Sequence, residues 1–172
     1  NMTYRAAWDP ARVGDFSGFS IRNDKGEQVL LERWTGIPWT RQLDKVEYLC
    51  KLYNYAPLDI DRTGVGDTLV EAAIQRGLDA TGHFFTNQFK ELIVNNLSLL
   101  LEQKTIILLD DESLKSELKA YTYKMTKTNK VSYSHPPGGH DDMVDVTMLN
   151  FKDFTDTAIS MPYMGLLLGA KI

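Results

Sequence analysis

Short alternating runs of apolar and polar positions occupy the first part of the chain, which is typical of β-strands. An apolar-rich run over residues 3–9 ends in the loop "DPARVGD", and partial alternation follows over residues 17–24 and 27–34, on either side of the turn residues "KG". We therefore expect three consecutive strands, the later two antiparallel. Asp9 would stand at the end of a buried strand.

Helical spacing of apolar residues appears in the middle of the chain. Residues 38–54 predict a helix, and the stretch "APLDIDRTGVGD" predicts a short strand that ends at Asp61 and enters a glycine-containing turn. We expect Asp67 to cap a helix that Gly77 closes, followed by a short strand at "GHFF". The strongest helical period lies over residues 86–103.

The last third of the chain combines extended and helical patterns. We expect "TIILLDD" to form a short strand or extended segment before a helix that carries Leu114 and Leu118. The stretch "AYTYKMTKTNKVSYS" predicts a β-hairpin, and a final helix is expected to begin near His140. Together the elements predict one α/β domain over residues 1–172, with a central mixed sheet flanked by helices.

Composition excludes several classes of protein. The chain is 43% apolar and 24% charged, which is typical of a globular domain and not of a disordered or fibrous one. Its single cysteine, Cys50, excludes an internal disulfide and a cysteine-based zinc site, and we expect it to be a small buried residue. Neither a signal-peptide pattern nor a membrane-spanning apolar run is present in the sequence. A net charge of −4 argues against a generally basic nucleic-acid coat, but leaves a local basic patch open.

Acidic residues are concentrated at the predicted start of the last helix, in "HDDMVD". Asp141, Asp142 and Asp145 would lie within an arc of about 100° on that helix. One interpretation is helix capping, because carboxylates are favoured in the first turn of a helix. The other is a metal site, since Asp9 and Asp61 also close strands, and strand ends in α/β sheets are where ligands bind.

Carboxylates that converge from two strands and a helix would repel one another unless a cation neutralised them. Oxygen ligands in that number suit Mg²⁺ or Mn²⁺ and not zinc. Two such ions about 4 Å apart would hold the attacking and leaving oxygens of a phosphodiester.

Four blocks of the sequence are, in chain order, "YRAAWDPARVGDFSGFSI", "LDIDRTGVGD", "FTNQFKELIVNNLSLLLEQKTIILLDDESLKSEL" and "PPGGHDDMVDV". In their order and spacing they resemble the nuclease domain of tailed-phage terminase large subunits. The resemblance implies an RNase H-like (RuvC-like) fold with an additional β-hairpin near the active site. It also implies a metal-dependent endonuclease that cuts concatemeric double-stranded viral DNA at the start and end of packaging in the host cytoplasm.

The resemblance further implies which residues act. The catalytic metal ligands would be Asp9, Asp61 and Asp142, holding two Mg²⁺ or Mn²⁺ ions. Further carboxylates that could assist them are those of Asp15, Asp141 and Asp145.

The motor half of such a protein is not expected here. The sequence contains no G-x-x-x-x-G-K-[ST] phosphate loop, since "RTGVGD" lacks the lysine. We therefore expect a monomeric nuclease domain, the C-terminal part of a larger terminase whose ATPase domain is absent. Its partners, by resemblance, would be DNA, that ATPase domain, the small terminase subunit and the portal protein.

A basic stretch accompanies the predicted hairpin, with Glu117 as its one acid. Its lysines are Lys115, Lys119, Lys124, Lys127 and Lys130. They are consistent with a solvated edge strand or with contacts to the DNA backbone, and the resemblance favours DNA contacts by Lys124, Lys127 and Lys130. Arg62 could bind a phosphate or pair with a neighbouring acid.

His140 has three interpretations: a neighbour of the metal, a general base, or simply part of the helix start, which we favour. Two other functions remain open at this point: a Holliday-junction resolvase relative, which would prefer branched DNA, and a non-catalytic module that binds DNA or the portal.

Overall fold

A computed structural model of the chain describes residues 1–11, 15–127 and 140–156. Its elements, in chain order, are β1 (Tyr4–Asp9), β2 (Ser17–Asn23), β3 (Gln28–Trp34), α1 (Trp39–Leu52), β4 (Leu58–Asp61), α2 (Asp67–Gln75), β5 (Ala80–His83), α3 (Asn87–Glu102), α4 (Glu112–Lys127) and α5 (Asp142–Phe151). The strands form one sheet in the order β3-β2-β1-β4-β5. β1, β2 and β3 pair antiparallel, whereas β4 pairs parallel with both β1 and β5.

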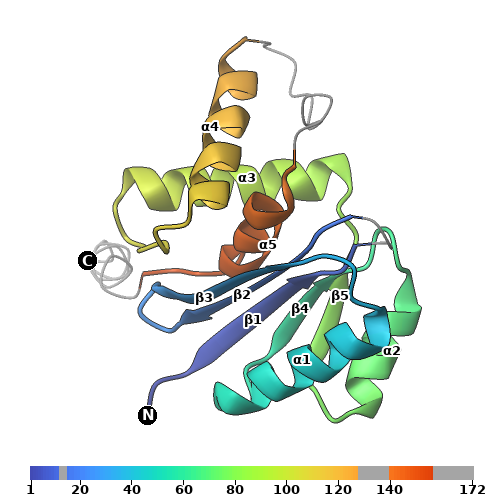
Figure 1. Cartoon of the computed structure of the whole chain (residues 1–172). Coiled ribbons are helices and arrows are strands. Elements are labelled where there is room, and N and C mark those ends of the chain that lie inside the picture. The colour runs from blue at the N-terminus through green and yellow to red at the C-terminus, as the bar shows by residue number, and fades with distance from the viewer. Residues whose placement is uncertain (12–14, 128–139, 157–172) are drawn as a thin grey trace, which may run out of the picture.

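Helices cover both faces of this mixed sheet (Figure 1). α1 and α2 lie on one face, and α5 lies on the other, with α3 and α4 beyond it. Each face has its own core: α1 buries Leu43, Val46 and Leu49 against the first face, while α5 buries Val146 and Leu149 beside Ala7 of β1. No helix in the described parts of the chain is long and apolar enough to cross a membrane.

The alternation of side chains along β1 and β4 determines which face the acids occupy. Successive residues of a strand point to opposite faces of its sheet. Trp8 and Ile60 belong to the core beneath α1 and α2, so the next residues, Asp9 and Asp61, project toward the face that α5 covers.

A glycine in β2 lets α5 approach the sheet closely. Gly18 pairs with Asp9 of β1, and a β-carbon added to it would lie 2.7 Å from the backbone oxygen of Asp142 and 3.0 Å from Val146 Cγ1. Any larger residue at position 18 would therefore displace the start of α5.

The five strands and the helices over residues 38–54, 67–77 and 86–103 confirm the sequence predictions in type and order. The segment before α4 forms no regular strand and contains one isolated bridge, between Glu27 and Ile107. α5 begins at Asp142, two residues after His140. The prediction that Asp67 caps α2 is wrong, because Gly66 is the N-cap residue and the Asp67 carboxylate pairs with Arg62 instead.

The predicted β-hairpin is wrong over residues 120–127, which form the second half of α4. Tyrosine and threonine at alternate positions favour a strand locally, but Leu114, Leu118 and Tyr121 recur at helical spacing and pack into the core with α3 and α5. Burial of that stripe overrides the local preference. The rest of the expected hairpin, residues 128–134, lies outside the described residues.

Candidate metal centre

The two strand-end aspartates lie side by side at one edge of the sheet. Trp8 of β1 pairs in parallel register with Ile60 of β4, so Asp9 and Asp61 follow at equivalent positions. They open into a cavity of about 530 Å³. Its lining residues are Asp9, Pro10, Ala11, Asp15, Asp61, Gly64, His140, Asp141, Asp142 and Asp145. All six aspartates singled out from the sequence therefore share one cavity.

Asp9 lies among the other acids. Burial raises the pKa of the Asp9 carboxyl well above its usual range, and four neighbouring carboxylates raise it further. In decreasing order of effect they are those of Asp61, Asp145, Asp142 and Asp141. Asp9 thus lies within electrostatic reach of both Asp61 on β4 and the acids at the start of α5.

The loop after β4 orients Asp61. Its Oδ1 accepts hydrogen bonds from the backbone amide of Thr63 at 2.9 Å and from the Thr63 hydroxyl at 2.6 Å. Thr63 Oγ1 in turn accepts a bond from the Phe85 amide at 2.8 Å. Burial raises the pKa of Asp61 although the bonds from Thr63 oppose that shift. The turn "DRTG" thus holds the Asp61 side chain at the cavity. No pattern in the sequence indicates this role for Thr63.

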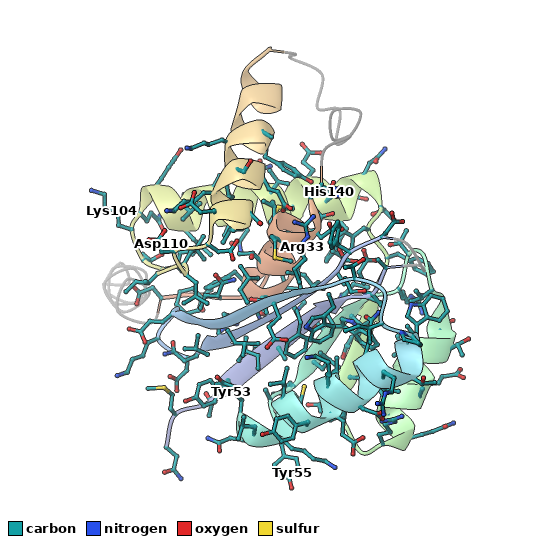
Figure 2. All side chains as sticks on the ribbon, viewed as in Figure 1. Arg33, Tyr53, Tyr55, Lys104, Asp110 and His140 are labelled. Atoms are coloured by element: carbon teal, nitrogen blue, oxygen red, sulfur yellow. The ribbon has the colours of Figure 1, made fainter. Side chains whose placement is uncertain are left out.

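Asp142 is the first residue of α5, and one of its two carboxylate oxygens, Oδ2, is buried and has no hydrogen-bond partner among the described residues. Arg33 Nη2 and His140 Nδ1 each lie 3.8 Å from this oxygen. Burial, followed by the charge of Asp141, raises the pKa of Asp142. Figure 2 shows Arg33 and His140 close together near the start of α5. Tyr53 and Tyr55, which follow the end of α1, lie on the opposite side of the sheet.

Asp145 is buried one turn further along α5, and both of its oxygens have partners. Tyr121 of α4 donates its hydroxyl to Oδ1 at 2.9 Å, and Lys90 Nζ of α3 lies 3.4 Å from Oδ2. Lys90 Nζ is also 3.6 Å from Asp141 Oδ2. Burial raises the pKa of Asp145, and the Lys90 ammonium opposes the shift. The protein itself therefore supplies this carboxylate with a cation and a hydrogen-bond donor.

The free amides at the start of α5 are bound by a residue of another helix. The N-cap residue Asp141 makes no side-chain cap hydrogen bond, whereas Glu117 Oε2 of α4 accepts bonds from Met143 N and Val144 N, both at 2.9 Å. Burial raises the pKa of Glu117 to about 7. This arrangement weighs against the capping interpretation of Asp141. Sequence reasoning missed Glu117 and Tyr121 because it assigned residue 121 to a hairpin; on a helix, positions 117 and 121 share a face.

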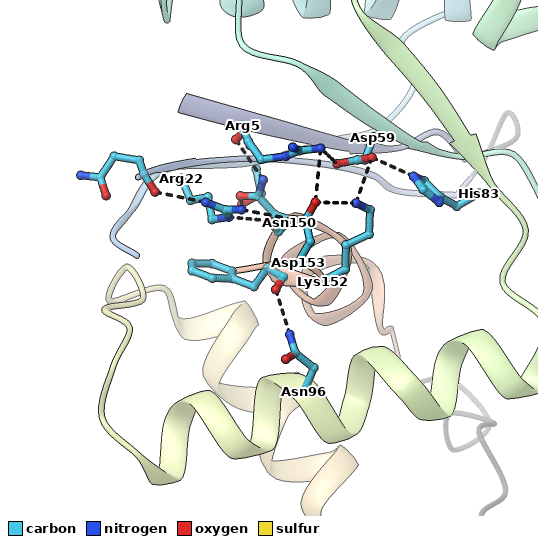
Figure 3. A network of polar contacts seen from close by, with 11 residues as sticks. Arg5, Arg22, Asp59, His83, Asn96, Asn150, Lys152 and Asp153 are labelled. Carbon is cyan, nitrogen blue, oxygen red and sulfur yellow. Dashed lines mark hydrogen bonds and ion pairs between the residues drawn. The ribbon is translucent and has the colours of Figure 1, made fainter. Parts of the chain in front are cut away.

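A second polar network anchors the other end of α5 (Figure 3). Asn150 donates from Nδ2 to Arg5 O and accepts at its backbone oxygen from Arg22 Nε, at 2.9 and 2.7 Å. Buried Asp59 of β4 bonds to His83 at 2.7 Å and lies 3.4 Å from Lys152 Nζ. α5 is thus fixed to the sheet near its end, behind the acidic cavity.

The remaining predicted residues fall at different distances from the cavity. Asp15 is an exposed lining residue, and His140 lines the cavity just before α5. Arg62 follows Asp61, pairs with Asp67 and lies with its guanidinium 3.9 Å from the centroid of the half-exposed Phe84 ring. The backbones of Lys124 and Lys127 belong to α4 rather than to a hairpin, and Lys130 lies outside the described residues.

The donor set suits a hard divalent cation, because it consists of carboxylate oxygens. The buried, unbonded Oδ2 of Asp142 and the raised pKa values of Asp9 and Asp61 are the features that a bound cation would relieve. Among the described residues, no three acidic, histidine or cysteine side chains already form a complete ion cage.

A mixed sheet with two carboxylates at adjacent strand ends and further acids at the start of a covering helix defines an RNase H-like domain. The chain belongs to the terminase RNaseH-like domain family, whose sequence pattern matches residues 6–152. The predicted family and the predicted mixed sheet flanked by helices are thereby confirmed, whereas the predicted hairpin is not found over residues 120–127.

Three known proteins illustrate the relationship. The large terminase subunit of Thermus virus P23-45 is 30% identical over 142 residues, which cover 81% of this chain but only 29% of that protein. The large terminase nuclease of thermophilic phage G20c, in a crystal structure with bound magnesium, is 28% identical with a TM-score of 0.80, over 90% of this chain and 83% of that one. The nuclease domain of the Thermus phage P74-26 large terminase is 26% identical with a TM-score of 0.75, over 91% and 82%. The G20c nuclease has also been solved with bound zinc and with bound cobalt.

Proposed function

We propose that this chain is a metal-dependent endonuclease domain that cuts double-stranded DNA for a viral packaging terminase. The observation that carries the proposal is the convergence of Asp9, Asp61 and Asp142, from two strands and a helix, on one cavity. Burial raises the pKa values of all three carboxyls, and neighbouring aspartates raise those of Asp9 and Asp142 further. A purely structural cluster would gain nothing from that repulsion.

Asp9, Asp61 and Asp142 are the proposed metal ligands and catalytic residues. The unbonded Oδ2 of Asp142 supports placing it ahead of Asp145, whose two oxygens already face Tyr121 and Lys90. Asp141, Asp145 and the exposed Asp15 are proposed as assisting carboxylates. Two divalent ions, when bound, would activate water for attack on phosphorus and stabilise the leaving oxygen.

The surrounding residues keep the acids in place. Thr63 fixes Asp61 through two hydrogen bonds, so that its second oxygen can face the cavity. Lys90 lowers the repulsion between Asp141 and Asp145. His140 lies near Asp142 but is half-exposed, which supports a role as part of the helix start rather than as a buried base.

The metal is proposed to be Mg²⁺ or Mn²⁺, with two ions bound. The all-oxygen donor set favours these hard ions. The G20c nuclease has been crystallised with magnesium, zinc and cobalt, which supports a site for divalent ions in this family. Cleavage rates measured with each ion in turn would show which ion the site prefers.

DNA is proposed to approach over residues that flank the cavity. Arg62 follows Asp61 directly, and its guanidinium stacks on exposed Phe84, so that it offers donors and an aromatic neighbour to a phosphate or base. Lys124 and Lys127 on α4, together with Lys130, are proposed to contact the DNA backbone. Neutralising these residues should weaken DNA binding and lower its salt dependence.

The larger assembly is also a proposal. The chain spans less than a third of the P23-45 large subunit, so residues 1–172 are proposed to be the nuclease part of a longer protein acting with an ATPase domain, a small subunit and a portal in the host cell. A mildly acidic domain would bind DNA weakly alone, and tethering to a motor would raise its effective concentration.

Plasmid nicking and linearisation test the proposal. Supercoiled plasmid should be cut with millimolar Mn²⁺ or Mg²⁺ and remain intact with EDTA. A Holliday-junction substrate in the same assay should be cut no faster than linear duplex. Equal cleavage with EDTA, or a preference for junctions by orders of magnitude, would contradict the proposed function.

A further inference from the structure

Helix α4 contacts the metal-binding end of α5 through a buried acid. Glu117 is only 6% exposed, and its Oε2 accepts the backbone amides of Met143 and Val144. These two residues directly follow Asp142, one of the proposed ligands. The position of the α5 backbone at the cavity is therefore tied to a side chain that does not itself line the cavity.

This contact replaces the usual cap at the start of a helix. The first amides of a helix have no acceptor within the helix and need one from elsewhere. The N-cap side chain of Asp141 makes no such bond, so it is left to face the cavity and Lys90. Because α4 supplies the cap, the aspartate carboxylates at the start of α5 do not have to accept these amides and can bind a cation instead.

The same helix also holds an α5 side chain. Tyr121 lies one turn after Glu117 on α4 and donates its hydroxyl to Asp145 Oδ1 at 2.9 Å. The helix thus orients both the backbone at the start of α5 and a carboxylate one turn later. Both contacts join α4 to α5. Figure 1 shows α4 beside α5, on the side of α5 that faces away from the sheet.

We propose that Glu117 and Tyr121 are positioning residues of the metal centre: α4 sets the place of Asp142 and the orientation of Asp145, and thereby the affinity for divalent metal. This inference rests on the proposed function. It adds that metal affinity depends on a helix outside the cavity, through hydrogen-bond acceptance by Glu117 and donation by Tyr121.

Binding of Mn²⁺, measured by electron paramagnetic resonance of the free ion, tests this without any cleavage. Glu117→Ala should weaken Mn²⁺ binding by about 10-fold or more, as loss of a hydrogen bond behind the ligands commonly does. Glu117→Gln should bind within about 3-fold of wild type, because its amide oxygen can still accept both backbone amides. Tyr121→Phe should also weaken binding by roughly 10-fold.

Glu112→Gln is the matched control, since Glu112 lies on the same helix, is exposed and pairs with Lys115 three residues later. It should bind Mn²⁺ like the wild type. Circular dichroism checks that each variant is folded; if Glu117→Ala is not, Tyr121→Phe and Glu117→Gln decide.

The outcomes separate the two proposals. If wild-type protein binds no Mn²⁺, the proposed function itself fails. If wild type binds but folded Glu117→Ala or Tyr121→Phe binds equally well, only the positioning role is overturned. If Glu117→Gln loses as much affinity as Glu117→Ala, the carboxylate charge acts directly, and positioning by hydrogen bonding is overturned.

Discussion

Gly18 of β2 lies directly against the backbone of Asp142 at the start of α5. A β-carbon at position 18 would lie 2.7 Å from the Asp142 carbonyl oxygen, which is too close for any real contact. Gly18 is also the cross-strand partner of Asp9. The absence of a side chain at this one position therefore lets a carboxylate on α5 reach a carboxylate on β1.

Gly18→Ala should displace the start of α5 and weaken the metal centre. The contact is with backbone, which cannot rotate away, so we expect a loss of about 1–3 kcal/mol in the free energy of unfolding. Urea denaturation measures it. Gly64→Ala is the control, because a β-carbon there meets nothing within 4 Å, and its change should stay within about 0.5 kcal/mol. Equal stabilities of the two variants would show that α5 does not need this close approach.

The metal-free protein should become less stable as the pH rises from 5 to 8. Asp9, Asp61, Asp142, Asp145 and Glu117 have pKa values raised by folding, so the native state holds their protons more tightly than the unfolded chain. Their contribution is complete below the unfolded pKa values, near 4, and is lost as the pH rises through the native values, about 7 for Glu117. We expect the free energy of unfolding to fall by at least about 1 kcal/mol over this range.

Acids with lowered pKa values do not cancel this trend. Asp59 and Asp153 contribute stability that is lost only as the pH falls below about 4, outside the tested range. Saturating Mn²⁺ should reduce the decline between pH 5 and 8, because the ion binds the deprotonated carboxylates. Thermal unfolding with EDTA and with Mn²⁺ at both pH values measures the effect. A metal-free protein that gains stability toward pH 8 would contradict this electrostatic picture.

Lys90→Met should destabilise the metal-free protein and increase its response to metal. The change removes the ammonium 3.4 Å from Asp145 and 3.6 Å from Asp141, leaving buried carboxylate charge without a counter-ion. At pH 8 we expect the free energy of unfolding to fall by roughly 1–3 kcal/mol and the Mn²⁺-induced rise in melting temperature to exceed that of wild type. Lys51→Met, which breaks an exposed pair with Glu47, is the control and should change neither quantity appreciably. An unchanged response of Lys90→Met to Mn²⁺ would exclude Lys90 as a counter-ion of the site.

Much of the site follows from the sequence because its acids stand at element boundaries. Strand ends at Asp9 and Asp61, and the acidic helix start at Asp142, are visible in the pattern of apolar residues and turns. The partners of those acids are not visible in the same way. Glu117, Tyr121 and Lys90 belong to helices whose contacts with α5 depend on packing between distant segments, and no local spacing reveals such contacts.

The hairpin shows where local preference misleads. Tyr121 lies in a tyrosine- and threonine-containing stretch that suits a strand, yet its ring packs with Leu118 and Leu114 on the buried side of α4. Burial of that stripe decided the structure. The local pattern predicts a strand for the lysines of the same stretch, whereas the backbones of Lys124 and Lys127 belong to helix α4.

The central claim is that Asp9, Asp61 and Asp142 hold the metal that cuts DNA, and Asp61→Asn tests it most directly. This change keeps the side-chain shape and the oxygen that can accept the hydrogen bonds from Thr63, but removes the charge that would bind a cation. The initial rate of plasmid cleavage in Mn²⁺ is compared with wild type, with Asp44→Asn as an exposed control on α1. We predict a loss of at least about 100-fold for Asp61→Asn and an unchanged rate for Asp44→Asn. Cleavage by Asp61→Asn at the wild-type rate would contradict the account.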